Sequence, residues 1–285
     1  YGNLPLPSYP TISSIKMNFD TYGIVSTIKE NYQLDVSAKK LPGELDLNFY
    51  LETPGGAAYI FKVANQNELR VNLELQNACI RHLLSKNLGL TVSTLVTSIT
   101  NQDILELKSD TGNIRLARLL TWVEGRVLAS VNPHSTNLLE RLGEMCGTLC
   151  LSLVDFDHPA AHRFMKWNPS EALWIKPHLI NFRGERKELV AYFLTLFETT
   201  ALPLLPHLRK SINYNDANDY NVLVSHDAEN PTVPGVIDFG DLVYTHTVNE
   251  LAIAIAYAIM GKTDPLEAAC HIVTGFNNKL QLTEK

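Results

Sequence analysis

The chain has 285 residues, 45% of them hydrophobic and 19% charged, which is enough to bury the core of one bilobal unit or of two small domains. The net charge is −6 and no basic block occurs, which argues against a nucleic-acid partner because phosphate binding needs clustered Lys and Arg. No basic n-region precedes an apolar h-region, so a signal peptide is not expected, and the most apolar run, residues 251–260, is far short of a bilayer span, so no membrane association is expected.

The first part of the chain alternates helix and strand patterns. A helix is predicted over residues 15–29, after the capping residues Ser13 and Ser14. Strands are predicted over residues 45–52, 57–64, 91–100, 104–108 and 114–123, with an amphipathic helix at 68–85. These elements indicate a small α+β lobe, and we place its boundary so that residues 1–122 form an N-terminal lobe and residues 123–285 a C-terminal lobe.

Helix patterns dominate the second part. They cover residues 136–153, 185–198 and 249–260, and the only later strands predicted are two short apolar runs at 222–224 and 236–237. A polar, Pro-containing turn separates these two runs, so they are expected to form a hairpin. The fold class predicted is therefore α+β, with a larger and mostly helical C-terminal lobe.

Two carboxylate-rich motifs flank this hairpin. Residues 214–221 read Tyr-x-Asp-x-x-x-x-Asn, and residues 238–241 read Asp-Phe-Gly-Asp. Phosphoryl transfer from ATP needs such a pair, because one Asp accepts the proton of the attacking hydroxyl while an Asn and a second Asp hold Mg²⁺. Each motif alone is weak, and the alternative is two Asx-rich turns; together they favour a kinase site with Asp216 as base and Asn221 and Asp238 as metal ligands.

Lys62 is the candidate phosphate-binding cation. It lies among apolar residues of a predicted strand, where a charge is costly unless it is paired. The chemistry predicts a Glu partner on the following helix. The alternative is an edge-strand Lys that reaches solvent.

With these motifs, the chain resembles the aminoglycoside phosphotransferase/choline kinase family of small-molecule kinases, which have a bilobal protein-kinase-like fold. It is most similar to the branch that contains hydroxylysine kinases and the phosphotransferase domains fused to class III aminotransferases. Residues 41–49 and 61–65 are similar to that branch's nucleotide loop and Lys strand. The resemblance covers most of the chain.

The resemblance implies further site residues. Glu74 is the expected partner of Lys62, with Glu68 as the second choice. Gly43 marks the nucleotide loop, and the backbone from Leu120 to Trp122 is expected to meet adenine. ATP and Mg²⁺ are the expected cofactors.

One position departs from the family. Residue 214 is Tyr, where most relatives have a His that organises the catalytic loop, and a Tyr hydroxyl donates one hydrogen bond but does not imitate both imidazole nitrogens. Asp219 and Asp241 are either additional metal-site residues or loop-forming residues, and the sequence leaves both open.

The acceptor is the least determined part. A protein substrate is disfavoured, because Asp241 passes almost directly into the helix at 249 and leaves no peptide platform. The resemblance places the acceptor pocket at residues 155–186 and favours hydroxylysine; homoserine, choline, ethanolamine or an aminoglycoside are alternatives. A non-catalytic nucleotide-binding module is the other hypothesis, although it would be expected to have lost Lys62, Asp216 or Asn221.

The histidine pair and the cysteines are expected to have structural roles. His158 and His162 have a spacing that occurs in zinc sites, but no third ligand is near, so a solvent or helix-start role is favoured. The four Cys have no C-x-x-C spacing, and Cys146 and Cys150, four residues apart on a predicted apolar helix, are expected to be packed free thiols, which suits a cytoplasmic location. The absent initiator Met and the polar C-terminal residues leave open a fusion to another domain, or a continuation into one.

Overall fold

The computed structural model describes residues 19–86, 89–108, 112–227 and 229–283. These divide into two compact units. The first contains residues 1–68 and 95–122, and the second contains residues 69–94 and 123–285. The predicted caps Ser13 and Ser14 lie outside the described residues.

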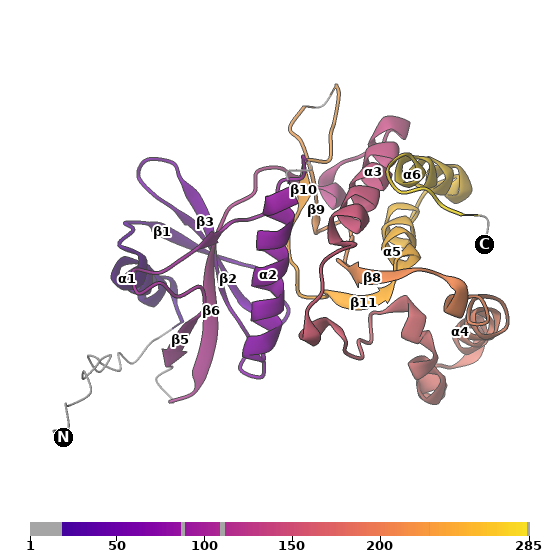
Figure 1. Ribbon diagram of the computed structural model, residues 1–285, viewed down its shortest axis with the longest axis horizontal. Helices are drawn as coiled ribbons and strands as arrows, with labels where there is room; N and C mark the ends of the chain where they lie inside the picture. Colours follow the sequence, from indigo (N-terminus) through magenta and orange to yellow (C-terminus); the bar gives the residue numbers. More distant parts are fainter. Residues whose placement is uncertain (1–18, 87–88, 109–111, 228, 284–285) are drawn as a thin grey trace, which may run out of the picture. The chain divides into compact units, whose positions relative to one another are not determined.

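An antiparallel sheet and one helix make up the first unit (Figure 1). The strand order is β1-β2-β3-β6-β4, and β5 also pairs with β6. The elements are α1 (Thr21–Tyr32), β1 (Ser37–Leu41), β2 (Leu47–Glu52), β3 (Ala58–Val63), β4 (Leu95–Val96), β5 (Leu105–Lys108) and β6 (Ile114–Thr121). The strand expected over residues 91–100 is therefore wrong except at its centre, where Leu95 and Val96 pair with β6.

Side chains along the strands point alternately to the two faces of the sheet, and one face forms the core of the first unit. Phe61 and Val63 on β3 are fully buried against Ile24 and Ile28 of α1, in a cluster that also includes residues of β2, β5 and β6. Because successive strand residues point to opposite faces, Lys62 lies on the other face of the sheet. The side chain of Asp20 caps α1 by accepting a hydrogen bond from the backbone N–H of Gly23 at 2.8 Å.

The second unit is mostly helical. Its α-helices are α2 (Arg70–Lys86), α3 (Thr136–Leu153), α4 (Gly184–Leu196), α5 (Val248–Ala258) and α6 (Pro265–Lys279). The 3₁₀ helices are η1 (Leu128–Ser130), η2 (Pro159–Ala161), η3 (Pro169–Asn181) and η5 (Leu205–His207), and η4 (Phe197–Ala201) is a π-helix. Helix α3 has the predicted bounds, and no helix among the described residues is long and apolar enough to cross a membrane.

Two small sheets complete the second unit. β9 (Val222–Val224) pairs antiparallel with β10 (Gly235–Val236) and with β7 (Arg126–Val127), while β8 (Lys210–Asn213) pairs with β11 (Val243–His246). The predicted hairpin is thus confirmed. The expectation that it holds the only later strands is wrong, because β8 and β11 are short, carry polar residues, and find their partner about thirty residues away in sequence.

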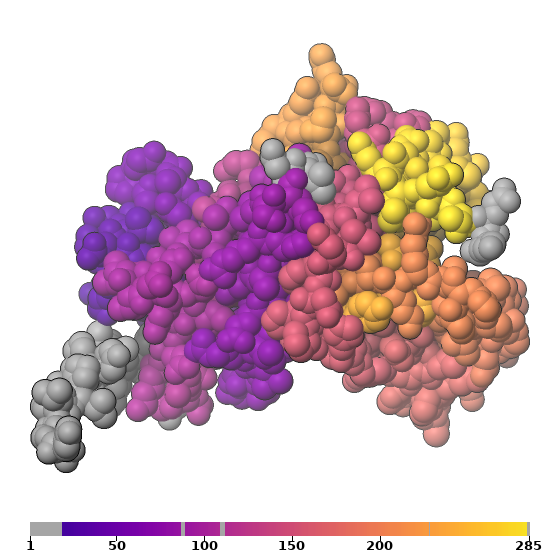
Figure 2. Space-filling view, viewed as in Figure 1, coloured from indigo at the N-terminus to yellow at the C-terminus, as the bar shows by residue number. Residues whose placement is uncertain are grey.

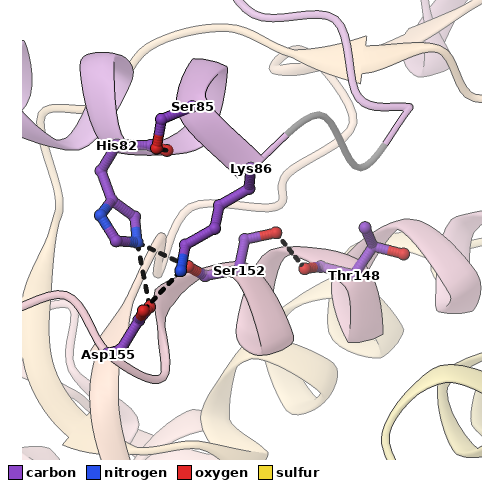
Figure 3. Close-up of polar contacts among 6 residues, drawn as sticks. All are labelled: His82, Ser85, Lys86, Thr148, Ser152 and Asp155. Carbon is purple, nitrogen blue, oxygen red and sulfur yellow. Dashed lines mark hydrogen bonds and ion pairs between the residues drawn. The ribbon is translucent and has the colours of Figure 1, made fainter.

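Helix α2 belongs to the second unit, whereas the sequence placed residues 69–94 in the first lobe. Polar contacts with the end of α3 explain this grouping (Figure 3). His82 Nε2 lies 2.8 Å from the Ser152 carbonyl oxygen and 3.2 Å from Asp155 Oδ1, while Lys86 Nζ lies 2.5 Å from Asp155 Oδ2. The ring of His82 also lies against Phe156, with 5.1 Å between centroids.

Helices α3 and α6 lie side by side, and the outer face of α6 forms part of the surface in Figure 2 (yellow). Glycines allow their backbones to approach. A Cβ atom on Gly143 would lie 1.9 Å from the carbonyl oxygen of Ile272, and one on Gly275 would lie 1.9 Å from that of Glu140. Helix α3 also packs on α5, which carries Glu250, an acid of the candidate site described below.

Candidate active site

Asp216 lies in the loop between β8 and β9, where two amides hold its carboxylate. Asn218 Nδ2 donates to Asp216 Oδ1 at 2.7 Å, and Asn221 Nδ2 donates to Asp216 Oδ2 at 2.5 Å. The loop is also closed by its own backbone, since the N–H of Asn218 donates to the Asp216 carbonyl at 2.7 Å. Both carboxylate oxygens therefore have a defined direction before any substrate binds.

The environment of Asp216 raises its pKa to about 7. Burial is the largest cause, and the carboxylates of Asp241 and Asp238 raise it further, while the bonds from Asn218 and Asn221 act in the opposite direction. A carboxylate with a pKa near neutrality is a better proton acceptor than an ordinary Asp and is still substantially ionised at pH 7.

Asn221 and Asp238 lie at the same end of the β9–β10 hairpin. Val222 pairs with Val236, and the N–H of Ile237 donates to the Asn221 carbonyl at 3.0 Å, so Asn221 precedes a paired position and Asp238 follows the residue bonded to it. Asp238 has a left-handed backbone with φ 63°, and its Oδ1 accepts from the N–H of Gly240 at 3.2 Å. This turn directs residues 238–241 away from the strand.

The donor set fits Mg²⁺ by its chemistry. The amide nitrogen of Asn221 is bonded to Asp216, and its amide oxygen receives no protein donor within the described chain. That oxygen and the Asp238 carboxylate are hard ligands of the kind that Mg²⁺ takes, in small number, together with phosphate oxygens. Across the described ranges, no group of three or more His, Cys, Asp or Glu is arranged to hold a metal.

Tyr214 is fully buried and makes the one hydrogen bond that its hydroxyl can donate. The acceptor is the Ile237 carbonyl at 2.5 Å, directly before Asp238. Its ring meets Phe239 edge-on, with 5.3 Å between centroids. Burial raises the Tyr214 pKa well above its usual value, so the hydroxyl keeps its proton and stays a donor. Tyr214 thus ties the catalytic loop to the second motif.

Glu250, on α5, is a residue of this site that the sequence reading missed. Its side chain is fully buried, and Oε2 accepts from the backbone N–H of Asn215 at 2.8 Å. Asn215 has φ 64°, so this bond holds a left-handed residue next to Asp216. Burial raises the pKa of Glu250 to about 7. An acid in the first turn of an otherwise apolar helix was the available signal.

The residues proposed to bind nucleotide are divided between the two units. Lys62 pairs in register with Asn48 on one side and with Arg118 on the other. Glu74 is exposed on α2 in the second unit, and Glu68 lies in the first. The Lys62–Glu74 pair and its alternative with Glu68 therefore stay predictions.

Gly43 lies in a tight loop before β2. A Cβ atom there would come within 2.4 Å of the Asp46 carbonyl oxygen and 2.8 Å of Asn48 Nδ2, so the loop requires a glycine. At the end of β6, Leu120 is buried, and the N–H of Trp122 donates to the Ala58 carbonyl at 3.0 Å. The ring of Trp122 meets Tyr50 edge-on, with 5.0 Å between centroids.

Several charged residues of the predicted acceptor region have structural partners. Asp155 binds Lys86 and His82, and Arg163 donates to the carbonyls of Gly240 and Leu242. His158 and His162, whose spacing occurs in zinc sites, have other roles. His158 caps η2 by accepting from the N–H of Ala160 at 3.2 Å, and His162 lies 2.7 Å from Asp157 and stacks on Tyr244.

Comparison with known proteins gives a consistent result. Residues 37–273 match the model of the phosphotransferase enzyme family. The chain is 30% identical over 284 residues to a hydroxylysine kinase of Xenopus laevis, covering 92% of this chain and 75% of that protein. It is 28% identical over 282 residues to a hydroxylysine kinase of Danio rerio, covering 94% of this chain and 78% of that protein.

Solved structures share the fold. A microcompartment-associated aminopropanol kinase superposes with a TM-score of 0.72 at 16% identity, covering 92% of this chain and 82% of that one. The amicoumacin kinase hAmiN, solved with AMP-PNP and Ca²⁺, gives a TM-score of 0.70 at 16% identity, covering 93% and 79%. The bilobal protein-kinase-like fold that the family resemblance implied is thereby confirmed.

Proposed function

Because the chain belongs to the phosphotransferase enzyme family and is a kinase, we propose that it transfers the γ-phosphoryl group of ATP to a hydroxyl of a small amino alcohol or amino acid, with hydroxylysine as the first choice. The similarity to hydroxylysine kinases over more than nine-tenths of the chain supports this acceptor. A cytoplasmic location, suggested by four free thiols, belongs to the same proposal.

The observation that carries the proposal is the pair of amide hydrogen bonds to the carboxylate of Asp216. Phosphoryl transfer leaves little covalent chemistry to the protein, so the base has to be held in position. The amides of Asn218 and Asn221 provide this, and a pKa of about 7 suits proton acceptance from a substrate hydroxyl as the phosphorus–oxygen bond forms.

The nucleotide and the metal are assigned to the remaining residues. Asn221 and Asp238 would hold Mg²⁺, which neutralises the phosphate charge when bound. Lys62 would bind phosphate with Glu74 as its partner, Gly43 would let the backbone approach the nucleotide, and Leu120 and Trp122 would border adenine. These roles come from the motifs and from the family.

The amine preference rests on charge. Asp216, Asp219 and Asp241 lie within or next to the two motifs and give this part of the second unit a negative field, which favours a cationic acceptor. A bound Mg²⁺ neutralises part of that field. Homoserine, choline, ethanolamine and aminoglycosides follow hydroxylysine in order, and the field by itself does not rank them.

The alternative, a non-catalytic nucleotide-binding module, had Tyr214 as its only sequence support. The Tyr214 hydroxyl is hydrogen-bonded to the backbone directly before Asp238, so the loop is organised without His. This observation supports catalysis and does not favour the alternative.

The test is a coupled ADP-release assay with Mg–ATP over a panel of acceptors: hydroxylysine, homoserine, choline, ethanolamine, an aminoglycoside, neutral sugars and nucleosides. We expect acceptor-dependent ADP release with hydroxylysine and less or none with neutral sugars. Lysine, which lacks the hydroxyl, is the matched control and should give only background. Activity confined to sugars or nucleosides would exclude the amine proposal, and no activity with any acceptor would support the non-catalytic alternative.

A further inference from the structure

Arg163 contacts the backbone of the second motif. It follows η2, and its Nη2 donates to the carbonyl oxygen of Gly240 at 2.9 Å and to that of Leu242 at 3.3 Å. These two carbonyls flank Asp241. One guanidinium nitrogen therefore bridges the peptide groups on both sides of a carboxylate in the proposed metal loop.

This loop lies outside regular secondary structure. Residues 238–241 lie in no helix or strand, and the Gly240 N–H donates to the Asp238 side chain in a turn. Asp238 and Asp241 also repel negative charge, as their effect on the pKa of Asp216 shows. Like charges repel, so hydrogen bonds donated by a cation to the backbone of this acidic loop act against that repulsion.

The charge of Arg163 fits that task. Among the described residues it forms no ion pair with a carboxylate, and its Nε is buried without a hydrogen-bond partner. A partly buried guanidinium without an acid beside it is costly, and its bonds to two carbonyls of the acidic loop offset that cost. The next residue back, His162, stacks on Tyr244 with 4.5 Å between centroids, so the segment 162–163 contacts the chain on both sides of Leu242.

We propose that Arg163 is a positioning residue for the metal-binding loop, and that it holds Asp238 and Asp241 in place for Mg²⁺ instead of contacting the acceptor. The proposal rests on the proposed function, because it takes Asp238 as a metal ligand. It reassigns a cation that the sequence placed in the acceptor pocket.

The experiment compares Arg163→Gln and Arg163→Lys with the parent protein. Calorimetry measures the binding of AMP-PNP at a series of Mg²⁺ concentrations, and hydrogen exchange of the 239–243 amides is followed in the metal-free protein. The control is Arg141→Gln, which removes a guanidinium whose partner is Glu144 on the same exposed helix face.

We expect Arg163→Gln to raise the half-saturating Mg²⁺ concentration about tenfold or more, the size expected for a lost charge-assisted hydrogen bond. Exchange of the loop amides should speed up, while acceptor KM at saturating Mg²⁺ stays within about twofold, since the acceptor is not touched. The half-saturating Mg²⁺ concentration of Arg163→Lys should lie between those of the parent protein and of Arg163→Gln, because the ammonium keeps the charge but lacks the planar guanidinium. Arg141→Gln should match the parent.

Two results would overturn the proposal. One is an unchanged Mg²⁺ requirement with unchanged loop exchange in both variants. The other is a raised acceptor KM at an unchanged Mg²⁺ requirement, which would return Arg163 to the acceptor pocket. Asp238→Ala separates this from a failure of the metal site: if it abolishes Mg²⁺-dependent binding while the Arg163 variants do not weaken it, only the role of Arg163 fails.

Discussion

At the scale of single residues, two acids near the first motif are held by different bonds. Asp216, the proposed base, has both carboxylate oxygens hydrogen-bonded to side-chain amides. Glu250 holds the peptide N–H of the preceding residue, Asn215, and its second oxygen, Oε1, is buried without a partner. A buried carboxylate with a hydrogen bond to only one oxygen lowers the free energy of unfolding when it is ionised. The loss of stability at Glu250 therefore depends on pH.

We expect Glu250→Gln to reveal that cost. The native pKa of about 7 lies above the usual 4.5, so the folded protein holds a proton that the unfolded chain releases as pH rises between these values, and wild-type stability falls over this window. The Gln variant still has an oxygen for the Asn215 N–H and no charge. Urea denaturation should show its stability relative to wild type rising by roughly 2–3 kcal/mol from pH 4.5 to pH 8, the order given by the shift.

The control for this pH dependence is Glu229→Gln, in an exposed loop of the same unit. Its stability difference from wild type should not change over the same range. A pH-independent difference for Glu250→Gln would mean that the pKa of Glu250 is the same in the folded protein as in the unfolded chain.

The sequence proposed candidate site residues only where a motif or the family resemblance carried them. Asp216, Asn221 and Asp238 stand in fixed patterns, and the hairpin that brings Asn221 and Asp238 to one end is readable from its two apolar runs. Glu250 and Arg163 bond to backbone groups 35 and 77 residues away, and a contact to a peptide group leaves no pattern in the partner's sequence.

At the scale of elements, the backbones of α3 and α6 approach each other closely. Gly143 and Gly275 allow backbone contact between these helices, and α3 also packs against α5, the helix of Glu250. The sequence predicted α3 to the residue, because its apolar period is strong, whereas α6 was not predicted. The packing of α6 on α3 depends on glycines, which a hydrophobicity pattern does not detect.

We predict that Gly143→Ala destabilises the protein even though Ala is the better helix former. The new methyl group would stand 1.9 Å from the backbone oxygen of Ile272, so the helices must move apart. Overpacking of this kind costs about 1–3 kcal/mol, more than the roughly 1 kcal/mol gained in propensity at the upper end. Chemical denaturation measures the change.

Gly55→Ala is the matched substitution, because the nearest atom to its added Cβ would be 3.9 Å away. It should change stability by less than about 0.5 kcal/mol. Equal stability of the two variants would show that the α3–α6 contact accommodates a methyl group.

At the scale of the whole molecule, the two units carry different parts of the proposed reaction. The nucleotide-binding candidates Lys62 and Gly43 lie in the first unit, and the base and metal candidates lie in the second. The sequence predicted the α+β fold, which agrees with the structure, while the division into lobes at residue 122 stays a prediction. It did not predict the grouping of α2 with the second unit, because that grouping rests on contacts of His82 and Lys86 with residues about seventy positions away.

The most direct test of the account is phosphoryl transfer from Mg–ATP to hydroxylysine by the parent protein and by Asp216→Asn, with the phosphorylated product followed by mass spectrometry. The account predicts product from the parent and a rate lower by about 10²–10⁴-fold in the variant, the usual contribution of a general base. Mg–ATP affinity, measured by calorimetry on the same samples, should be nearly unchanged. Turnover of the variant within a few-fold of the parent would contradict the role of Asp216, and no phosphorylated product from the parent would contradict the choice of hydroxylysine.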